Sequence, residues 1–169
     1  MPKTLIGVVG GHSHNTTPQA LGLAERVGFE VGMRGMGVVC GGEDGVMEAA
    51  CRGCKKSGGA TIGIIKGNSL RTDRPYLDYA ILTSMDVACN NIIIWSSAGV
   101  LAFDGKFGTL NEIALALDFG KPLISLGAHL YLKLENINSE QFAHYEGYDH
   151  ARVPEILDRL ESMIRAARK

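Results

Sequence analysis

The sequence predicts an α/β fold: a Rossmann-like, doubly wound parallel sheet in a three-layer αβα arrangement. Short apolar runs alternate with longer segments of helical periodicity, which indicates right-handed strand–helix–strand units and a parallel sheet. The apolar runs are nearly uninterrupted, as expected of strands buried on both faces. Because 169 residues lie within the usual size of one domain, about 100–200 residues, we expect a single Rossmann-like domain over residues 1–169.

In the first half of the chain, the first two apolar runs end at paired glycines, which is typical of a strand followed by a tight turn. Apolar residues then recur at helical spacing until further glycines stop them. Thr17 and Pro18 add an N-cap and a proline at the first position of the first helix. We expect strands at residues 5–9, 37–40 and 60–65, and helices from residue 18 to before Gly35 and from Gly45 to Gly58.

The second half continues the same alternation. We expect strands at residues 79–82, 99–103 and 122–126, and helices at residues 86–97 and 109–119. A final amphipathic helix, residues 154–168, carries an apolar stripe for the core. Residues 128–149 show no such pattern. The simplest interpretation is a solvent-exposed loop, with an insertion or an oligomer contact as the alternatives.

Composition and charge argue against several classes of protein. The net charge of −1 provides no basic surface of the kind that a general nucleic-acid binder needs. The uncharged stretch at residues 87–103 is shorter than the ~20 residues of a membrane-spanning helix, and the first residues lack a signal-peptide pattern. Four cysteines are too few for a disulfide scaffold. We therefore expect a cytoplasmic protein with neither nucleic acid nor membrane as a partner.

Cys51 and Cys54 are spaced like a redox or zinc motif, but they fall in the middle of an expected helix, on its apolar stripe. A redox Cys-x-x-Cys begins at a helix N-terminus, and a zinc site needs about four ligands. We therefore interpret both cysteines as core residues and expect no metal site. A charged loop follows the third strand, where an arginine could hold an anion or simply face solvent; its residues are Arg71, Asp73 and Arg74.

Glycine is the most over-represented residue, with 22 in 169 and no repeating pattern. Carboxyl ends of parallel strands meet at one sheet edge, where ligands bind, and helix N-termini suit phosphate. The glycines that follow three of the expected strands are Gly10, Gly11, Gly41, Gly42, Gly45, Gly105 and Gly108. They predict a phosphate cradle, although tight turns in any such fold would also use glycine. In the first of these loops, Ser13 could hydrogen-bond a phosphate, and His12 and His14 are either ligand contacts or exposed residues.

The third glycine cluster belongs to a longer pattern, FDGKFGTLNE, over residues 103–112. Glu112 would lie near the start of the expected helix, at the ligand edge of the sheet, where a carboxylate can act on a bound molecule. The spacing of Thr109 and Glu112 also fits a capping box, in which both residues only stabilise the helix start. The spacing alone leaves both interpretations open.

These residues resemble the PGGxGTxxE signature of the family once misnamed lysine decarboxylases. That family includes the LONELY GUY phosphoribohydrolases and the short molybdenum-cofactor carrier proteins, and the resemblance is closest to the carriers. Residues 41–64, GGEDGVMEAACRGCKKSGGATIGI, resemble the GGxxxGxM segment of the same family. The resemblance covers about residues 5–127. It implies a Rossmann-like fold, a homodimer or homotetramer, and a nucleotide-phosphate or pterin-phosphate ligand.

The sequence departs from the family pattern at two places. Asp104-Gly105-Lys106 stands where the signature has Pro-Gly-Gly, and Cys89 stands where the hydrolytic members have an arginine that acts together with the glutamate. A neutral cysteine supplies neither a fixed cation nor bidentate donors.

The resemblance therefore favours a binding or carrier protein for the molybdenum cofactor or another phosphate-bearing ligand. The alternative is a nucleoside 5′-monophosphate phosphoribohydrolase with Glu112 as its catalytic residue. The implied ligand-binding residues are Gly10, Gly11, Ser13, Gly41, Gly42, Gly45, Met47, Gly105, Lys106, Phe107, Gly108 and Thr109.

Overall fold

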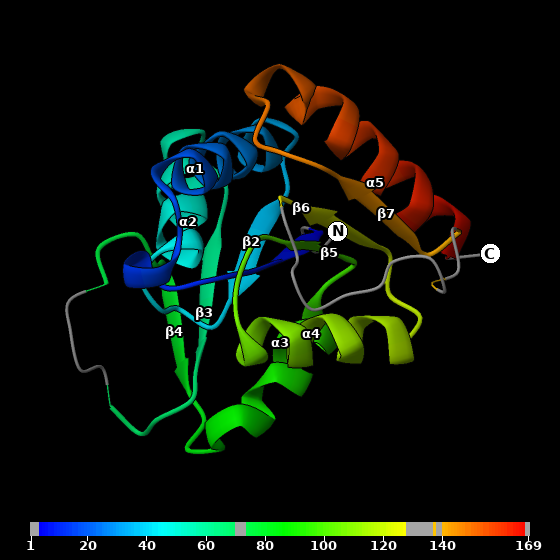
Figure 1. Ribbon diagram of the computed structural model, residues 1–169. Helices are drawn as coiled ribbons and strands as arrows, with labels where there is room; N and C mark the ends of the chain where they lie inside the picture. Colours follow the sequence, from blue (N-terminus) through cyan, green and yellow to red (C-terminus); the bar gives the residue numbers. More distant parts are fainter. Residues whose placement is uncertain (1–3, 70–73, 128–136, 138–139, 168–169) are drawn as a thin grey trace.

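The computed structural model describes residues 4–69, 74–127, 137 and 140–167. A central sheet with helices on both faces confirms the predicted three-layer arrangement (Figure 1). All strands run parallel, in the order β4-β3-β2-β1-β5-β6-β7. Their bounds are β1 Leu5–Val9, β2 Gly37–Cys40, β3 Thr61–Ile65, β4 Tyr79–Leu82, β5 Gly99–Ala102, β6 Leu123–Leu126 and β7 Phe142–Tyr145.

The helices divide between the two faces of the sheet (Figure 1). Helices α1, α2 and α5 share one apolar core with the strands, and α3 and α4 share the other. Their bounds are α1 Pro18–Met33, α2 Val46–Lys56, α3 Cys89–Ser96, α4 Phe107–Asp118 and α5 Val153–Ala167. Thr17 caps α1 as predicted, because its side chain accepts a hydrogen bond from the Ala20 amide at 3.2 Å. Among the described residues, no helix is long and apolar enough to cross a membrane.

Three local expectations were wrong. Residues 142–145, inside the expected loop, form β7 and pair in parallel with β6, and Phe142 supplies the buried side chain that anchors this short edge strand. Residues 86–88 form a separate 3-10 turn before α3. Helix α4 begins at Phe107, two residues earlier than expected, because Lys106 rather than a later residue is its N-cap.

The order of the strands reverses between β1 and β5. From β1 the chain builds outward through β2, β3 and β4, and from β5 it builds the other way through β6 and β7. The loops that follow β1 and β5 therefore diverge at the carboxyl edge of the sheet. Such a reversal opens a crevice at which α/β proteins bind ligands.

Candidate functional site

A pocket lies at this reversal point, and we call it the crevice pocket. Its cavity volume is about 180 Å³. Its lining comes from the loops after β1, β2, β3 and β5 and from the starts of α3 and α4. The lining residues are Gly10, Gly11, His12, Asn15, Gly41, Glu43, Met47, Ile64, Lys66, Asp86, Val87, Cys89, Asn90, Lys106, Gly108, Thr109 and Glu112.

Gly11 ties three of these loops together through main-chain atoms. Its amide donates to the Asp104 carbonyl at 2.7 Å, and its own carbonyl accepts from the Val46 amide at 3.1 Å. A Cβ at Gly105 would overlap Thr109 and lie 3.2 Å from the Gly11 nitrogen, so the loops have no room for a side chain there. Several of the predicted cradle glycines therefore pack the loops against one another.

The start of α4 is open. A Cβ at Gly108 would meet nothing within 4 Å, and among the described side chains none hydrogen-bonds the amides of Gly108 or Thr109. The helix N-cap is Lys106, whose side chain makes no capping hydrogen bond. Amide groups in the first turn of a helix have no partner within it, and the positive end of the helix dipole favours an anion.

The capping-box interpretation of Thr109 and Glu112 is wrong. Because α4 begins at Phe107, Thr109 lies inside the helix and cannot be its N-cap. Glu112 lies one turn further along, with 8% of its surface exposed, and lines the crevice pocket. Within the described part of the chain, its carboxyl group forms neither a hydrogen bond nor an ion pair.

Burial raises the pKa of Glu112 to about 8, and the neighbouring Cys40 adds to the rise. The side chain is therefore a neutral carboxylic acid at pH 7 and can donate a hydrogen bond to an anion. Cys89, at the start of α3, lines the same pocket, and burial together with the nearby Glu112 raises the pKa of its thiol. The raised pKa keeps the Cys89 thiol neutral at pH 7.

An aspartate–histidine pair occupies the mouth of the pocket. His12 lines the pocket and bonds through Nδ1 to the Asp44 carboxylate at 2.6 Å, and Ser13 donates its hydroxyl to the same carboxylate. Partial burial opposes ionisation of Asp44, but the hydrogen bonds from Ser13 and His12 outweigh it and lower the pKa of this carboxyl. Ser13, predicted to contact phosphate, therefore orients Asp44 and does not line the pocket.

Lys66 is a pocket residue that the sequence analysis did not single out. It follows β3 directly and forms an ion pair with Glu43 at 3.3 Å. Its position could have identified it, because it directly follows a parallel strand, as the glycine loops do, and ligands bind at the carboxyl ends of such strands. Arg74 approaches Glu43 from the other side at 3.8 Å, while Arg71 and Asp73 lie outside the described residues.

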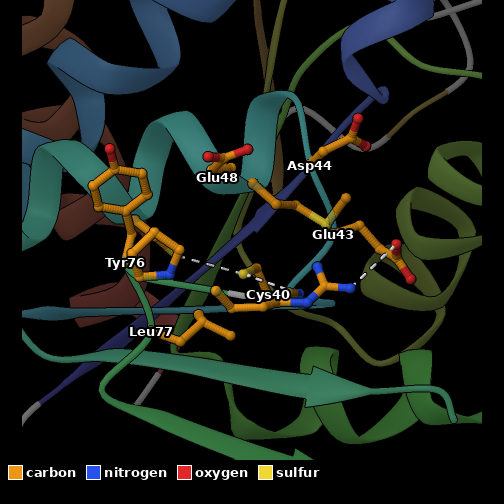
Figure 2. A pocket seen from close by; sticks show the side chains of 11 residues that line it. Cys40, Glu43, Asp44, Glu48, Tyr76 and Leu77 are labelled. Atoms are coloured by element: carbon orange, nitrogen blue, oxygen red, sulfur yellow. Dashed lines mark hydrogen bonds and ion pairs between the residues drawn. The ribbon is translucent and has the colours of Figure 1, made fainter. Parts of the chain in front are cut away.

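A second hollow, which we call the side pocket, lies between α2 and residues 74–77. Its cavity volume is about 70 Å³, and it shares Glu43 and Met47 with the crevice pocket. Figure 2 shows Cys40 at its centre, between Tyr76 and Leu77 on one side and Glu43 on the other. Cys51 and Cys54 are buried in mid-helix, as predicted.

The structure thus separates the predicted site residues into groups. Those that line the crevice pocket are Gly10, Gly11, Gly41, Met47, Lys106, Gly108, Thr109 and Glu112. Gly42 lines the side pocket, and Phe107 faces solvent with 74% of its surface exposed. Three further residues do not line the crevice pocket but make contacts between its loops: Ser13, Gly45 and Gly105.

Comparison with known proteins places the chain among described relatives. The sequence model of the SLOG cluster4 family matches residues 3–156. An uncharacterized protein of Archaeoglobus fulgidus is 37% identical over 122 residues, which are 72% of this chain and 78% of the relative.

Two solved structures are similar over nearly their whole length. The molybdenum cofactor binding protein of Rippkaea orientalis is 34% identical with a TM-score of 0.81, and the match covers 95% of this chain and 99% of that one. The Moco carrier protein of Chlamydomonas reinhardtii is 29% identical with a TM-score of 0.82 and the same coverage.

Proposed function

Because the chain belongs to the SLOG cluster4 family, we propose that it is a binding or carrier protein for a phosphate-bearing pterin or nucleotide, with the molybdenum cofactor as its cargo. The similarity to two molybdenum-cofactor proteins over 95% of the chain supports this choice of ligand. The observation that carries the proposal is the open start of α4 inside the crevice pocket.

A phosphate group fits the start of α4 on chemical grounds. The amides of Gly108 and Thr109 supply hydrogen-bond donors, and Lys106 supplies an exposed positive charge beside them. The neutral carboxyl of Glu112 adds a donor that does not repel the anion. The pocket, with a cavity volume of about 180 Å³, extends beyond this phosphate position to the loops after β1, β2 and β3.

The hydrolytic alternative receives no support from these residues. Glu112 carries no charge at pH 7, and the described lining of the crevice pocket contains no arginine to hold a ribose phosphate beside it. Cys89 cannot replace a bidentate cation. We therefore expect the protein to release no free base from AMP.

The direct test is a ligand panel. Purified protein is mixed with the molybdenum cofactor released from a molybdoenzyme, with AMP and with inorganic pyrophosphate, and its melting temperature is recorded. A ligand that binds only the folded state raises this temperature by mass action. Co-elution of molybdenum and pterin fluorescence with the protein identifies the cargo. An unchanged melting temperature with all three compounds at millimolar concentration contradicts the proposal.

Lys106 gives a variant test of the phosphate contact. We expect Lys106→Ala to weaken binding about two- to fivefold, equivalent to roughly 0.5–1 kcal/mol, because an exposed charge is largely screened by solvent. The loss should shrink as salt is added. Lys56→Ala is the matched control, since it removes the same charge at the far end of α2. Equal losses in both variants would assign the effect to net charge.

We also propose that the chain associates with itself along β4. This edge strand is exposed along its whole length, and Ile81 is 50% exposed within it. The nearby Val87 is 70% exposed and also lines the crevice pocket, so a second copy would lie beside the ligand. Exposed apolar edges of this kind are typical of interfaces. Light scattering should show an oligomer that Ile81→Lys converts to a monomer; a monomeric parent protein would contradict this.

A further inference from the structure

Two cysteine sulfur atoms meet in the wall of the side pocket. Cys40 is the last residue of β2 and Cys51 lies in the middle of α2, and their Sγ atoms are 3.6 Å apart. A disulfide needs about 2.05 Å, so the sulfurs must approach by about 1.5 Å. Cys54, one turn further along α2, directs its thiol to the Ala60 carbonyl at 3.6 Å instead.

The pair differs from an ordinary buried pair because it borders a pocket. Both cysteines line the side pocket, and the mostly buried side chain of Arg74 lines it as well. The two cysteines are themselves buried, with 0% and 1% of their surfaces exposed, so the side pocket is the route by which a small oxidant would approach their sulfur atoms.

The two thiols are chemically unequal. The hydrogen bond from Cys51 lowers the pKa of Cys40, against the effect of burial, and the Gly42 amide at 3.3 Å adds to this lowering. The same hydrogen bond, together with burial, raises the pKa of Cys51. Cys40 is thus the more acidic of the two thiols, which suits it to the attacking role and Cys51 to the resolving role.

We propose that Cys40 and Cys51 are a redox-active dithiol pair that a hydroperoxide converts reversibly to a disulfide. The Cys40 thiolate attacks the O–O bond, which gives a sulfenic acid and releases the alcohol or water that takes up the proton. The Cys51 sulfur then displaces hydroxide from the sulfenic acid, the S–S bond forms, and the Cys51 proton completes a water molecule. Two thiols are oxidised and one peroxide is reduced; two equivalents of a small thiol, which leave as their own disulfide, reverse the step.

The test maps the bond in the wild-type protein. The protein is treated with hydrogen peroxide, alkylated in denaturant, and digested with a glutamate-specific protease and trypsin. Cleavage after Glu43, Glu48 and Arg52 places Cys40, Cys51 and Cys54 on separate peptides. We expect a linked pair of Cys40 and Cys51 peptides that disappears with dithiothreitol and forms equally in Cys54→Ala. Free thiols at both positions, irreversible sulfinic acid at Cys40, or a link to Cys54 would overturn the proposal.

Two variants test the order of attack. In Cys51→Ser we expect a sulfenic acid trapped at Cys40, detected with dimedone, whereas Cys40→Ser should leave Cys51 unmodified. Equal labelling of the two variants would contradict the assigned roles. If either variant fails to fold, the peptide map of the wild-type protein still decides whether the bond forms.

Discussion

Two loops end at helix starts on the same edge of the sheet, yet they use their glycines in opposite ways. At the β2–α2 loop, Gly45 has φ +74°, and the Val46 amide that follows it is already bonded to the Gly11 carbonyl. At the β5–α4 loop, Gly108 faces empty space and the helix amides beside it are open to the crevice pocket. A glycine cluster therefore marks either backbone packed on backbone or backbone presented to a ligand, and only neighbouring loops decide which.

The largest expected effect breaks the packed loop. A Cβ at Gly45 would overlap the Gly11 carbonyl oxygen and lie 2.6 Å from the Ser13 nitrogen, in a conformation that L-residues rarely adopt. We expect Gly45→Ala to lower the free energy of unfolding by on the order of 4 kcal/mol, the combined cost of strain and overlap. Urea denaturation measures this loss. A change below about 1 kcal/mol would show that the loop can relax, and the two loops would then differ less than proposed.

The second effect concerns Glu112 at the open loop. Its pKa of about 8 in the folded protein exceeds the ordinary value of 4.5, so between these pH values the folded state holds a proton that the unfolded state has lost. Stability therefore falls as pH rises from about 4.5 to about 8. Glu112→Gln removes this titration.

We expect Glu112→Gln to be more stable than the parent protein by about 2–3 kcal/mol at pH 7, and the difference to vanish below pH 4.5. Denaturation midpoints of both proteins across this pH range measure it. A difference that does not depend on pH would mean that Glu112 is already ionised in the folded protein.

The third effect sharpens the comparison at the open loop. Gly108→Ala and Gly108→Glu both place a side chain in empty space, but only the second adds a negative charge at the start of α4. Both should keep or slightly raise stability, by up to about 1 kcal/mol, because helix propensity improves and a carboxylate suits the helix start. Gly108→Glu should weaken binding of the phosphate-bearing ligand at least about tenfold, or roughly 1.4 kcal/mol.

Equal affinity of the two Gly108 variants for the ligand would show that the phosphate does not bind at the start of α4. Isothermal titration with the ligand identified in the panel makes this measurement. The pair of variants separates charge from bulk at one position, which a single substitution cannot do.

The fold was predictable because its signals are local and repeated. Short apolar runs, several of them closed by glycine, placed six of the seven strands, and Thr17 with Pro18 marked the start of α1. Strand β7 was missed because four residues, only one of them a buried anchor, do not form a pattern that stands out from a loop.

The site was predictable only in part, since its meaning depends on contacts between loops. The sequence placed the glycines at the correct edge of the sheet, but nothing in it distinguishes Gly45, packed under Gly11, from Gly108, open to the pocket. The capping-box spacing was misleading because α4 begins two residues earlier than the sequence predicted. The neutral state of Glu112 arises from burial, which a single sequence does not reveal.

The hydrogen bonds of Gly11 have a consequence for how this scaffold can evolve. They join three loops through main-chain atoms alone, so they do not depend on which side chains surround them. The side chains that line the pocket are not part of these main-chain hydrogen bonds; examples are Lys106, His12 and Lys66. Substitutions of these pocket-lining side chains can change which ligand binds without breaking the hydrogen bonds of Gly11. Ligand specificity can therefore diverge while the backbone fold stays the same.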